Sequence, residues 1–355
     1  MSRIQILLWL LYGFLLFLLF LIGIQLANAV RIQNYLSQTL RTPLPKAPRL
    51  DSFRITNPYD APGEYRKAQL HLHTSRSRDV REKIPVGDTI RKYQAAGYQF
   101  VAITDHDLIT TCPELNSSNF LCLPGMEITI PYIFWPLGRH MAVINIRQGP
   151  GSAGQKISWK KLQRGELFSG SFIIPAHPNW RGNLGTGFWF LMDIFKLSGC
   201  RMIEISNHHS DSGLDVLLWH KLLALRGDEH PVWGVAVDDT DNGQPLDRGW
   251  IMVKTDAVTE ASLMTSLKNG AFYATTGPSA YFQVDGGTIT AHTTPASQIS
   301  FIDGQNKEVA SLQGESATYR PLGDEGFIRV EIQDANGRKA WSQPFFLIPG
   351  ESPAK

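Results

Sequence analysis

The sequence predicts an α/β fold in which parallel strands, covered by helices, close into a barrel. An apolar helix precedes the barrel and a small β-sandwich-like domain follows it. From about residue 67 onward, apolar strand-like runs alternate with helical patterns, which is typical of parallel strands covered by helices. Most of these runs are followed at once by His, Asp or Glu. Because the loops of a barrel converge on one face, such endings favour a closed barrel over an open sheet.

The overall composition is that of an ordinary globular protein. At 355 residues the chain is long enough for a barrel and a small extra domain. Its formal net charge is only +2, so electrostatics give no reason to expect a nucleic-acid partner.

An uncharged apolar run from Ile6 to Ile24 stands near the N-terminus and is about long enough to cross a bilayer core. Residues 1–29 are therefore predicted to be an uncleaved transmembrane anchor. A cleaved signal peptide is the alternative, because Ala27-Asn28-Ala29 fits the small-residue pattern of a cleavage site. A buried core helix is disfavoured, since the run is apolar on every face. The first interpretation predicts a domain outside the cytoplasm tethered to the membrane, and the second predicts a secreted one.

Residues 30–64 are predicted to be a linker that holds the following domain away from the membrane. Prolines recur through this segment and disfavour a continuous helix. They are Pro43, Pro45, Pro48, Pro58 and Pro62.

The three cysteines, Cys112, Cys122 and Cys200, fit neither a disulfide framework nor a zinc-finger spacing. Cys112 and Cys122 bracket a polar loop and could pair in an oxidising compartment. Two separate buried thiols would explain them equally well, so both alternatives stay open.

Strands and helices alternate through residues 65–278, the predicted barrel. The predicted strands are Ala68–Leu72, Phe100–Thr104, Met141–Ile146, Phe172–Pro175, Met202–Ser206 and Val232–Val237. The predicted helices are Val86–Ala96, Ser158–Arg164, Phe188–Leu197, Leu214–Leu225 and Glu260–Lys268. Gly97 and Gly270 follow two of these helices and are suited to end them.

Residues 279–350 are predicted to form the small β-domain, because short alternating strands replace the earlier pattern after Pro278. Asn336-Gly337 is a strong hairpin signal between the last two strands. The predicted strands are Tyr281–Val284, Ile299–Ile302, Ala317–Arg320, Phe327–Ile332 and Lys339–Leu347.

His71 and His73 are the first candidate metal ligands. They lie two residues apart on a predicted strand, so both imidazoles point to the same face and can meet one metal ion. A solvated polar strand face would produce the same pattern, and the pair alone does not decide between the two.

Carboxylates crowd the ends of two apolar strands, in Thr104-Asp105-His106-Asp107 and in Asp238-Asp239-Thr240-Asp241. Carboxylates gathered at one place repel one another, and burying them is costly unless a cation or solvent relieves the charge. A bound metal would supply that cation. The alternatives are an aspartate helix cap for the first motif and a solvated acidic loop for the second.

Three further residues fit the same interpretation. Glu127 stands between apolar neighbours and could bridge two metals about 3.5–4 Å apart, although a salt bridge to a lysine would also hold it. His177 ends a strand in Ala176-His177-Pro178, where a core histidine bonded to the backbone is the alternative. His140 gives a weaker signal. Because the set offers N and O donors and no thiolate, it suits Mn, Fe or Zn.

The order and spacing of these motifs resemble the PHP family, the polymerase and histidinol phosphatase superfamily. The shared hallmarks are His71-Leu72-His73, Thr104-Asp105-His106-Asp107, Gly125-Met126-Glu127, Ala176-His177-Pro178 and the late Asp239-Thr240-Asp241. Residues 270–278 and 340–344 look like those of the carbaryl-hydrolase-like branch, which carries a C-terminal β-domain. The resemblance covers about Ala68 to Pro349.

The resemblance implies a distorted (β/α)7 barrel with two or three divalent metals. By position, His71, His73, Glu127 and Asp239 would hold one metal. Glu127 would bridge to a second metal, which His140 and His177 would also hold.

A third metal would use His106 with an early Asp and a late His, and here the sequence departs from the family. Arg78 occupies the position of the early Asp, with Asp79 one residue later, and Asp241 replaces the late His. Aspartate can still bind a hard cation, but it changes the charge and the metal preference of the site.

The expected activity is hydrolysis of a small phosphorylated substrate by a metal-activated water. Arg76 and Arg78 follow the histidine pair and could clamp a phosphate, as could Arg81 and Lys83, and His208 could contact the substrate. A solvated basic loop and a surface histidine are the alternatives.

Two other functions stay open. The branch resemblance suggests an ester, carbamate or amide substrate, for which Trp135, Trp180 and Trp189 could line a pocket, although core packing explains them more simply. The altered late motif could also mark a non-catalytic binding module tethered to the cell envelope.

Overall fold

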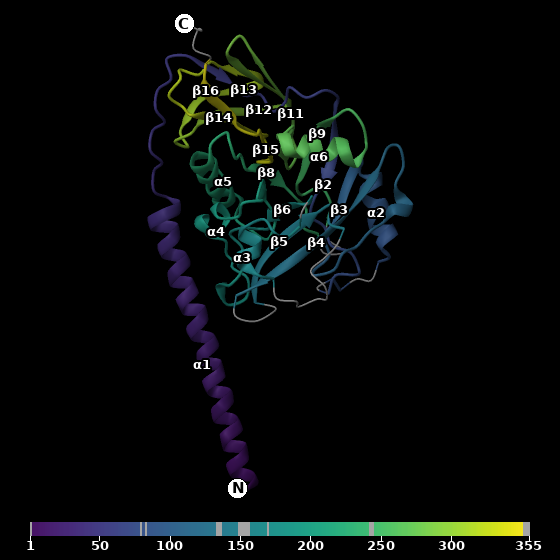
Figure 1. The fold of residues 1–355 in the computed structure, drawn as a ribbon, viewed down its shortest axis with the longest axis vertical. Helices are drawn as coiled ribbons and strands as arrows, with labels where there is room; N and C mark the ends of the chain where they lie inside the picture. The colour runs from purple at the N-terminus through teal and green to yellow at the C-terminus, as the bar shows by residue number, and fades with distance from the viewer. Residues whose placement is uncertain are drawn as a thin grey trace.

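The computed structural model describes residues 2–78, 80–81, 84–132, 137–147, 157–168, 170–240 and 245–350. A single long helix projects from a body in which strands and helices are packed together (Figure 1). The C-terminal strands lie at the end of the body that is farthest from the tip of this helix.

The projecting helix, α1 (Arg3–Tyr35), contains the apolar run and continues into a π-helical turn, η1 (Leu36–Leu40). Its most apolar stretch has a mean hydropathy of 2.7 and is not buried by the rest of the protein. Among the described residues it is the one helix long and apolar enough to cross a membrane, and a signal sequence would pass the same test. The predicted linker is helical up to Leu40, because its first proline is Pro43.

The last turns of α1 belong to the main hydrophobic core. Ile32, Leu36 and Leu40 are all buried in it. The polar side chain of Asn28 is buried too, and its Nδ2 donates to the backbone oxygen of Leu184 at 2.9 Å. The helix is therefore fixed to the body at its C-terminal end.

Seven strands surround the region in which the predicted ligands lie. Five of them are neighbours in chain order: β2 (Glu64–Gln69), β3 (Tyr98–Ile103), β4 (Leu121–Pro131), β5 (Gly138–Ile144) and β6 (Phe172–Pro175). The other two, β7 (Met202–Ser206) and β8 (Trp233–Ala236), form a separate parallel pair. Single bridges from Ile173 to Cys200 and from Leu72 to Thr240 link this pair to the segments of β6 and β2.

The predicted closed (β/α)7 barrel is not confirmed. Within the described residues the sheet is not closed, since β7 and β8 reach the other strands only through single bridges. The expectation of parallel strands throughout is also wrong, because β5 runs antiparallel to both β4 and β6. The connection from Pro131 to Gly138 is too short for the helical crossover that a parallel pair needs.

The predicted helices are confirmed, with ends that differ by a few residues. They are α2 (Val86–Ala95), α3 (Trp159–Gln163), α4 (Leu191–Phe195), α5 (Ser212–Arg226) and α6 (Glu260–Asn269). Asp211 caps α5 by accepting from the backbone of Gly213 and Leu214. Gly270 ends α6 with a φ of 70°, the left-handed geometry that glycine adopts most easily. Two short 3₁₀ turns are η2 (Pro113–Leu115) and η3 (Asn183–Gly185).

A second set of strands continues the sheet toward the C-terminus. Two of them, β9 (Trp250–Thr255) and β10 (Phe272–Thr275), join β2 to the C-terminal strands through antiparallel pairs. The others are β1 (Phe53–Ile55), β11 (Ser279–Asp285), β12 (Thr288–Asp303), β13 (Glu308–Tyr319), β14 (Phe327–Gln333), β15 (Lys339–Trp341) and β16 (Phe345–Pro349). The predicted strand segments between Tyr281 and Ile332 and the hairpin at Gly337 are thus confirmed, and the C-terminal strands enclose a second hydrophobic core. The predicted strand Lys339–Leu347 is divided into β15 and β16, with residues 342–344 outside any strand.

The structure joins Cys112 to Cys122 in a disulfide with a Cα–Cα distance of 5.9 Å, whereas Cys200 is a buried free thiol. Of the two alternatives that the sequence left open, the structure therefore has the bonded pair.

Candidate metal centre

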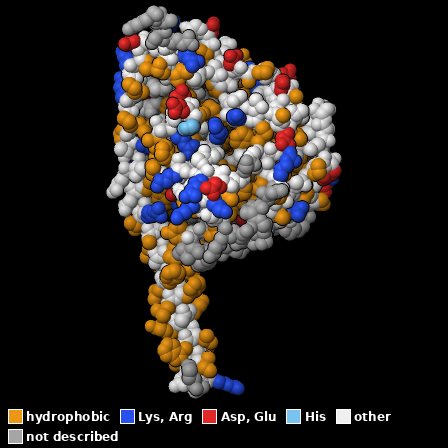
Figure 2. Space-filling model, viewed as in Figure 1, with side chains coloured by type: hydrophobic (Ala, Val, Ile, Leu, Met, Phe, Trp, Pro, Cys, Tyr) orange, Lys and Arg blue, Asp and Glu red, His pale blue; other side chains and the backbone are white. Residues whose placement is uncertain are grey.

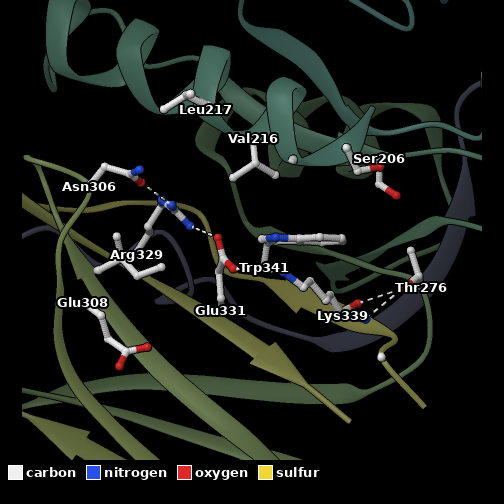
Figure 3. A pocket seen from close by; sticks show the side chains of 14 residues that line it. Ser206, Val216, Leu217, Thr276, Asn306, Glu308, Arg329, Glu331, Lys339 and Trp341 are labelled. Carbon is white, nitrogen blue, oxygen red and sulfur yellow. Dashed lines mark hydrogen bonds and ion pairs between the residues drawn. The ribbon is translucent and has the colours of Figure 1, made fainter. Parts of the chain in front are cut away.

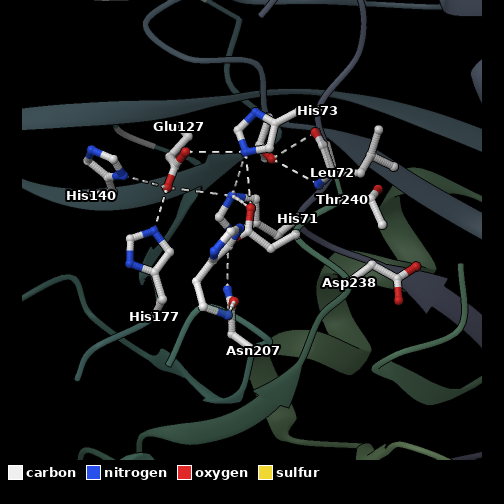
Figure 4. Close-up of polar contacts among 12 residues, drawn as sticks. His71, Leu72, His73, Glu127, His140, His177, Asn207, Asp238 and Thr240 are labelled. Atoms are coloured by element: carbon white, nitrogen blue, oxygen red, sulfur yellow. Dashed lines mark hydrogen bonds and ion pairs between the residues drawn. The ribbon is translucent and has the colours of Figure 1, made fainter. Parts of the chain in front are cut away.

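Seven predicted ligands converge at one place, although they come from segments far apart in the sequence. Figure 4 labels five of them. Most follow the end of a strand, while Glu127 and His140 lie within β4 and β5. The seven are His71, His73, His106, Glu127, His140, His177 and Asp239.

The chain is extended after β2, so His71 and His73 face the same side. Backbone hydrogen bonds tie this segment to the residues after β8. The Asp239 amide donates to the His71 carbonyl at 3.0 Å, and the His73 amide donates to the Thr240 carbonyl at 3.1 Å. Two of the ligands, His177 and Asp239, have φ angles of 30° and 47°. Such left-handed geometry is uncommon outside glycine, and it is found most often at functional sites.

The first half of the site is a cage of four donors. The Nε2 atoms of His71 and His73 are 3.2 Å apart, and they lie 3.2 and 3.1 Å from Oδ1 of Asp239. The carboxylate oxygens of Glu127 lie 3.5 Å from the first imidazole and 3.4 Å from the second. All four side chains are buried.

The spacing of these donors fits a metal ion. Four ligands at the roughly 2.0–2.1 Å distance of zinc–nitrogen bonds, placed at the corners of a tetrahedron, are about 3.3 Å from one another. The observed separations of 3.1 to 3.5 Å bracket that value. Two imidazole nitrogens that face each other also cannot both donate to one another, so a shared cation satisfies both.

The second half of the site is built on the same carboxylate. Oε1 of Glu127 lies 3.3 Å from Nδ1 of His140 and 3.2 Å from Nε2 of His177. Its Oε2 lies 3.0 Å from Nδ1 of His106. Glu127 is therefore in contact with five imidazoles, so a cation held by either group of histidines would have this carboxylate as a ligand.

The surrounding charges decide the ionisation of this centre. Burial raises the pKa of Glu127, but the nearby His106 and His140 outweigh it and hold that pKa well below its usual range. Burial lowers the pKa of His71, yet the carboxylates around it, Asp239 first, raise it well above its usual value. Among the described residues, no Lys or Arg pairs with Glu127 or Asp239, so only imidazoles balance their charge. A divalent cation would suit this environment.

Three residues that the sequence did not single out as ligand supports hold the ligands in place. Glu204 of β7 accepts from Nδ1 of His71 at 2.6 Å and from the backbone amide of His177 at 2.6 Å. Asn207 donates to both Glu204 and Asp239, at 2.7 and 2.8 Å.

Ser77 is the third of these supports, and its Oγ lies 3.2 Å from Nδ1 of His73. Partners of this kind fix the tautomer and the orientation of metal-binding imidazoles. The one signal in the sequence was Glu204, a carboxylate in an otherwise apolar strand.

Aromatic side chains pack beside the ligands. The Trp180 ring lies 4.9 Å from the ring of His140 and 4.8 Å from that of His177. Trp189 is fully buried, and its Nε1 donates to the backbone oxygen of His140 at 3.0 Å. Core packing thus explains Trp189, whereas Trp180 stays partly exposed beside the site; Trp135 lies outside the described residues.

Three of the remaining predicted site residues lie outside the described part of the chain. Asp79 and Asp241, the proposed ligands of a third metal, lie outside the described residues, as does Lys83. Arg78 forms an ion pair with Asp107 at 2.7 Å, and Arg76 is exposed.

The Nδ1–H of His208 donates to the backbone oxygen of Asp238 at 2.9 Å. Burial and the neighbouring His209 lower its pKa to about 4. The ring is therefore neutral near pH 7, where it could form a hydrogen bond to a substrate without carrying charge.

A large cavity lies elsewhere in the protein. A space of about 600 Å³ separates α5 from the C-terminal strands, with Val216 on one side and Trp341 on the other (Figure 3). Three of its charged residues pair with one another, Arg329 with Glu331 and Lys339 with Glu331. None of the predicted metal ligands lines it, so it is separate from the metal centre.

No protein-family model matches this chain, and no curated protein does. Two solved structures are distantly similar. One is a two-domain protein from Bacteroides vulgatus that contains a predicted PHP-like metal-dependent phosphoesterase. It is 14% identical with a TM-score of 0.46, over 84% of this chain and 89% of that one. The other, PsfC from Pseudomonas syringae, is 10% identical with a TM-score of 0.40, over 57% of this chain and 87% of its own. At these TM-scores neither likeness carries a functional argument, and neither bears on the carbaryl-hydrolase-like branch.

Proposed function

We propose that this protein is a metal-dependent phosphoesterase of the PHP type. The observation that supports the proposal best is Glu127, a fully buried carboxylate in contact with five imidazoles. No ordinary salt bridge explains such a cluster, and a pair of cations sharing one carboxylate does. The metal-binding motifs of the sequence support the same family.

The residues present fit two cations of the Mn, Fe or Zn type. His71, His73, Asp239 and Glu127 would hold one, and Glu127 with His140 and His177 would hold the other. A third, at His106 with Asp79 and Asp241, remains a proposal from the sequence alone. When bound, such cations polarise a phosphoryl oxygen and make a nearby water a stronger nucleophile.

The protein's own residues would orient the substrate. Arg76 is exposed next to the ligand segment and could pair with a phosphate oxygen. Arg78 forms an ion pair with Asp107, which fixes the position of its guanidinium. His208, neutral near pH 7 and donating through Nδ1 to Asp238, could accept at Nε2 from a hydroxyl of the substrate. We propose residues 65–278 as the catalytic part and residues 279–350 as an accessory β-domain.

We also propose that α1 is a retained membrane anchor, with the body outside the cytoplasm. Cleavage after Ala29 would remove Asn28 and its buried hydrogen bond to Leu184. The Cys112–Cys122 disulfide supports an oxidising compartment, where such bonds persist.

The full chain, purified in detergent, allows the activity to be tested directly. We expect at least two equivalents of Mn, Fe or Zn per chain by elemental analysis, and turnover of p-nitrophenyl phosphate or bis(p-nitrophenyl) phosphate that chelators abolish. Glu127→Gln should lose turnover by more than about 100-fold and lose bound metal, because the shared ligand is weakened. The exposed Glu308→Gln serves as the matched control and should keep both.

The other functions predict different outcomes of the same assay. Faster metal-dependent turnover of aryl esters or carbamates than of aryl phosphates would replace the phosphoesterase with an ester or amide hydrolase. Less than one metal equivalent per chain, without turnover of any substrate, would contradict an enzyme and favour a binding module.

A further inference from the structure

The segment from residue 180 to 191 contacts both the C-terminal part of α1 and two of the metal ligands. Asn28 of α1 donates to the backbone oxygen of Leu184 in η3. The approach is so close that a Cβ on the neighbouring Gly185 would lie 2.8 Å from Cβ of Asn28. A glycine with a φ of 72° occupies this position, where a side chain would be obstructed.

The contact extends along the next turn of the helix. The Tyr35 hydroxyl accepts from the backbone amide of Leu191 at 3.0 Å, and its ring packs edge-on against Phe188 and Phe190. The guanidinium of Arg31 lies 4.2 Å above the Phe190 ring. Polar, aromatic and cation–π contacts together thus pack the end of α1 against residues 184 to 191.

The same segment leads directly back to the metal centre. It begins after His177, and its Trp180 ring contacts the rings of both His140 and His177. Trp180 also fills the space beside Gly182 and Gly187, where a Cβ would come within 2.9 and 2.3 Å of its ring. Residues 180 to 191 therefore connect α1 to two of the metal ligands through a chain of direct contacts.

The position of this segment relative to a bilayer follows from helix geometry. The apolar run of α1 ends at Ile24, four residues before Asn28, and a helix rises about 1.5 Å per residue, or roughly 6 Å over that distance. The backbone of Leu184, which accepts from Asn28, thus lies near the lipid–water boundary if the run spans the membrane.

The surface of the body at this level suits a phospholipid bilayer. On α4, next to the contact with α1, Met192 and Phe195 expose 47% and 37% of their surface. Arg181 and Lys196 are exposed nearby and have no ion-pair partner among the described residues. Figure 2 shows Lys and Arg side chains gathered on the body just above the projecting helix. Basic side chains are attracted to a membrane surface that carries anionic lipid.

We propose that the substrate is the phosphoester of a phospholipid headgroup, taken from the bilayer that holds α1. This inference rests on the proposed phosphoesterase function and on α1 as a retained anchor. The contacts with α1 hold the body beside the membrane surface, on the side where residues 180 to 191 connect α1 to the metal centre. A lipid phosphate would then approach the ligands from the surface of the bilayer.

The first test moves the body away from the membrane without changing any residue of the body. The full chain is reconstituted in phosphatidylcholine vesicles that contain either phosphatidic acid or phosphatidylglycerol, and its turnover of these lipids is compared with that of soluble aryl phosphates. A polar helix-forming insertion of roughly seven residues between Gln25 and Leu26 lengthens α1 by about two turns, lifting the body by about 10 Å. We expect the ratio of lipid to soluble turnover to fall at least tenfold in this variant.

A charge reversal tests the surface itself. Arg181→Glu should lower the same ratio several-fold in vesicles with anionic lipid. Arg320→Glu, also an exposed arginine but located after β13 at the far end of the body, is the matched control and should leave the ratio as in the wild type.

The outcomes separate the inference from the function on which it rests. Turnover of the aryl phosphates without turnover of either lipid would overturn the inference and leave the phosphoesterase intact. A ratio that the insertion leaves unchanged would also overturn it, because the height of the body would then be irrelevant. Turnover of neither class of substrate by the metal-loaded wild type would contradict the proposed function itself.

Discussion

At the scale of single residues, the sequence identified the ligands better than their supports. His71, His73 and Glu127 were found because close spacing and a strand ending are local patterns. Glu204 was missed, although a carboxylate between Ile203 and Ile205 in a buried strand requires a partner. Two of its partners, His71 and His177, follow other strands, and nothing in the local pattern identifies them.

Glu204 should act as a positioning residue for the metal centre. Replacing it by glutamine keeps the size but weakens the hydrogen bonds to His71 and to the backbone of His177, so metal affinity should fall by about 10–100-fold. Titration of the metal-free protein with Zn by calorimetry measures this. Glu229→Gln, at an exposed position, is the control. An affinity unchanged by Glu204→Gln would contradict the positioning role.

Asp215 should make stability depend on pH. Burial raises its pKa from 3.8 to about 7 in the folded protein, although hydrogen bonds from Ser210 and Asn179 oppose this. The folded state then binds more protons than the unfolded state between these values, so this contribution to stability is greatest below about pH 4 and is lost as the pH rises through 7. We expect Asp215→Asn to stabilise the protein more at pH 7 than at pH 5, as measured by thermal unfolding in detergent. An effect equal at both pH values would contradict the raised pKa.

At the scale of elements, periodicity located strands and helices but not strand direction. Most residues of β5 were predicted as a strand because they form an apolar run. Such a run has the same pattern in a parallel strand and in an antiparallel one. Only the length of the connection from Pro131 to Gly138 carried the information that β4 and β5 form a hairpin. The prediction of a closed barrel was not confirmed for a related reason. Pairing between distant strands depends on contacts that no local sequence pattern records.

The end of α1 should contribute to folding as well as to membrane attachment. Leu40 is fully buried in the main core, so Leu40→Ala should lower the free energy of unfolding by about 2–5 kcal/mol. Val30→Ala, on the exposed side of the same helix, should change it little. Denaturant unfolding of the full chain in detergent compares the two variants. Equal stabilities would show that the helix end does not belong to the core.

At the scale of the whole molecule, the change of pattern after Pro278 marked the C-terminal strands but not their continuity with the rest. Antiparallel pairing of β15 with β10, and of β10 with β9, carries one sheet from the C-terminal strands to the metal-site strands. The side chain of Gln343 also bonds both backbone groups of Gly234 in β8, at 2.8 and 2.9 Å. These contacts couple the two hydrophobic cores.

This coupling predicts how the whole molecule responds to metal. Cations that bind only the folded state stabilise it, by about 2.7 kcal/mol when their free concentration is 100 times the dissociation constant. Because the cores share a sheet, the C-terminal strands should gain that stability together with the metal-site strands. We expect one calorimetric transition, shifted upward as a whole by Mn or Zn in the wild type and much less in Glu127→Gln. Two separate transitions, with only one moved by metal, would show that the accessory strands fold independently of the metal centre.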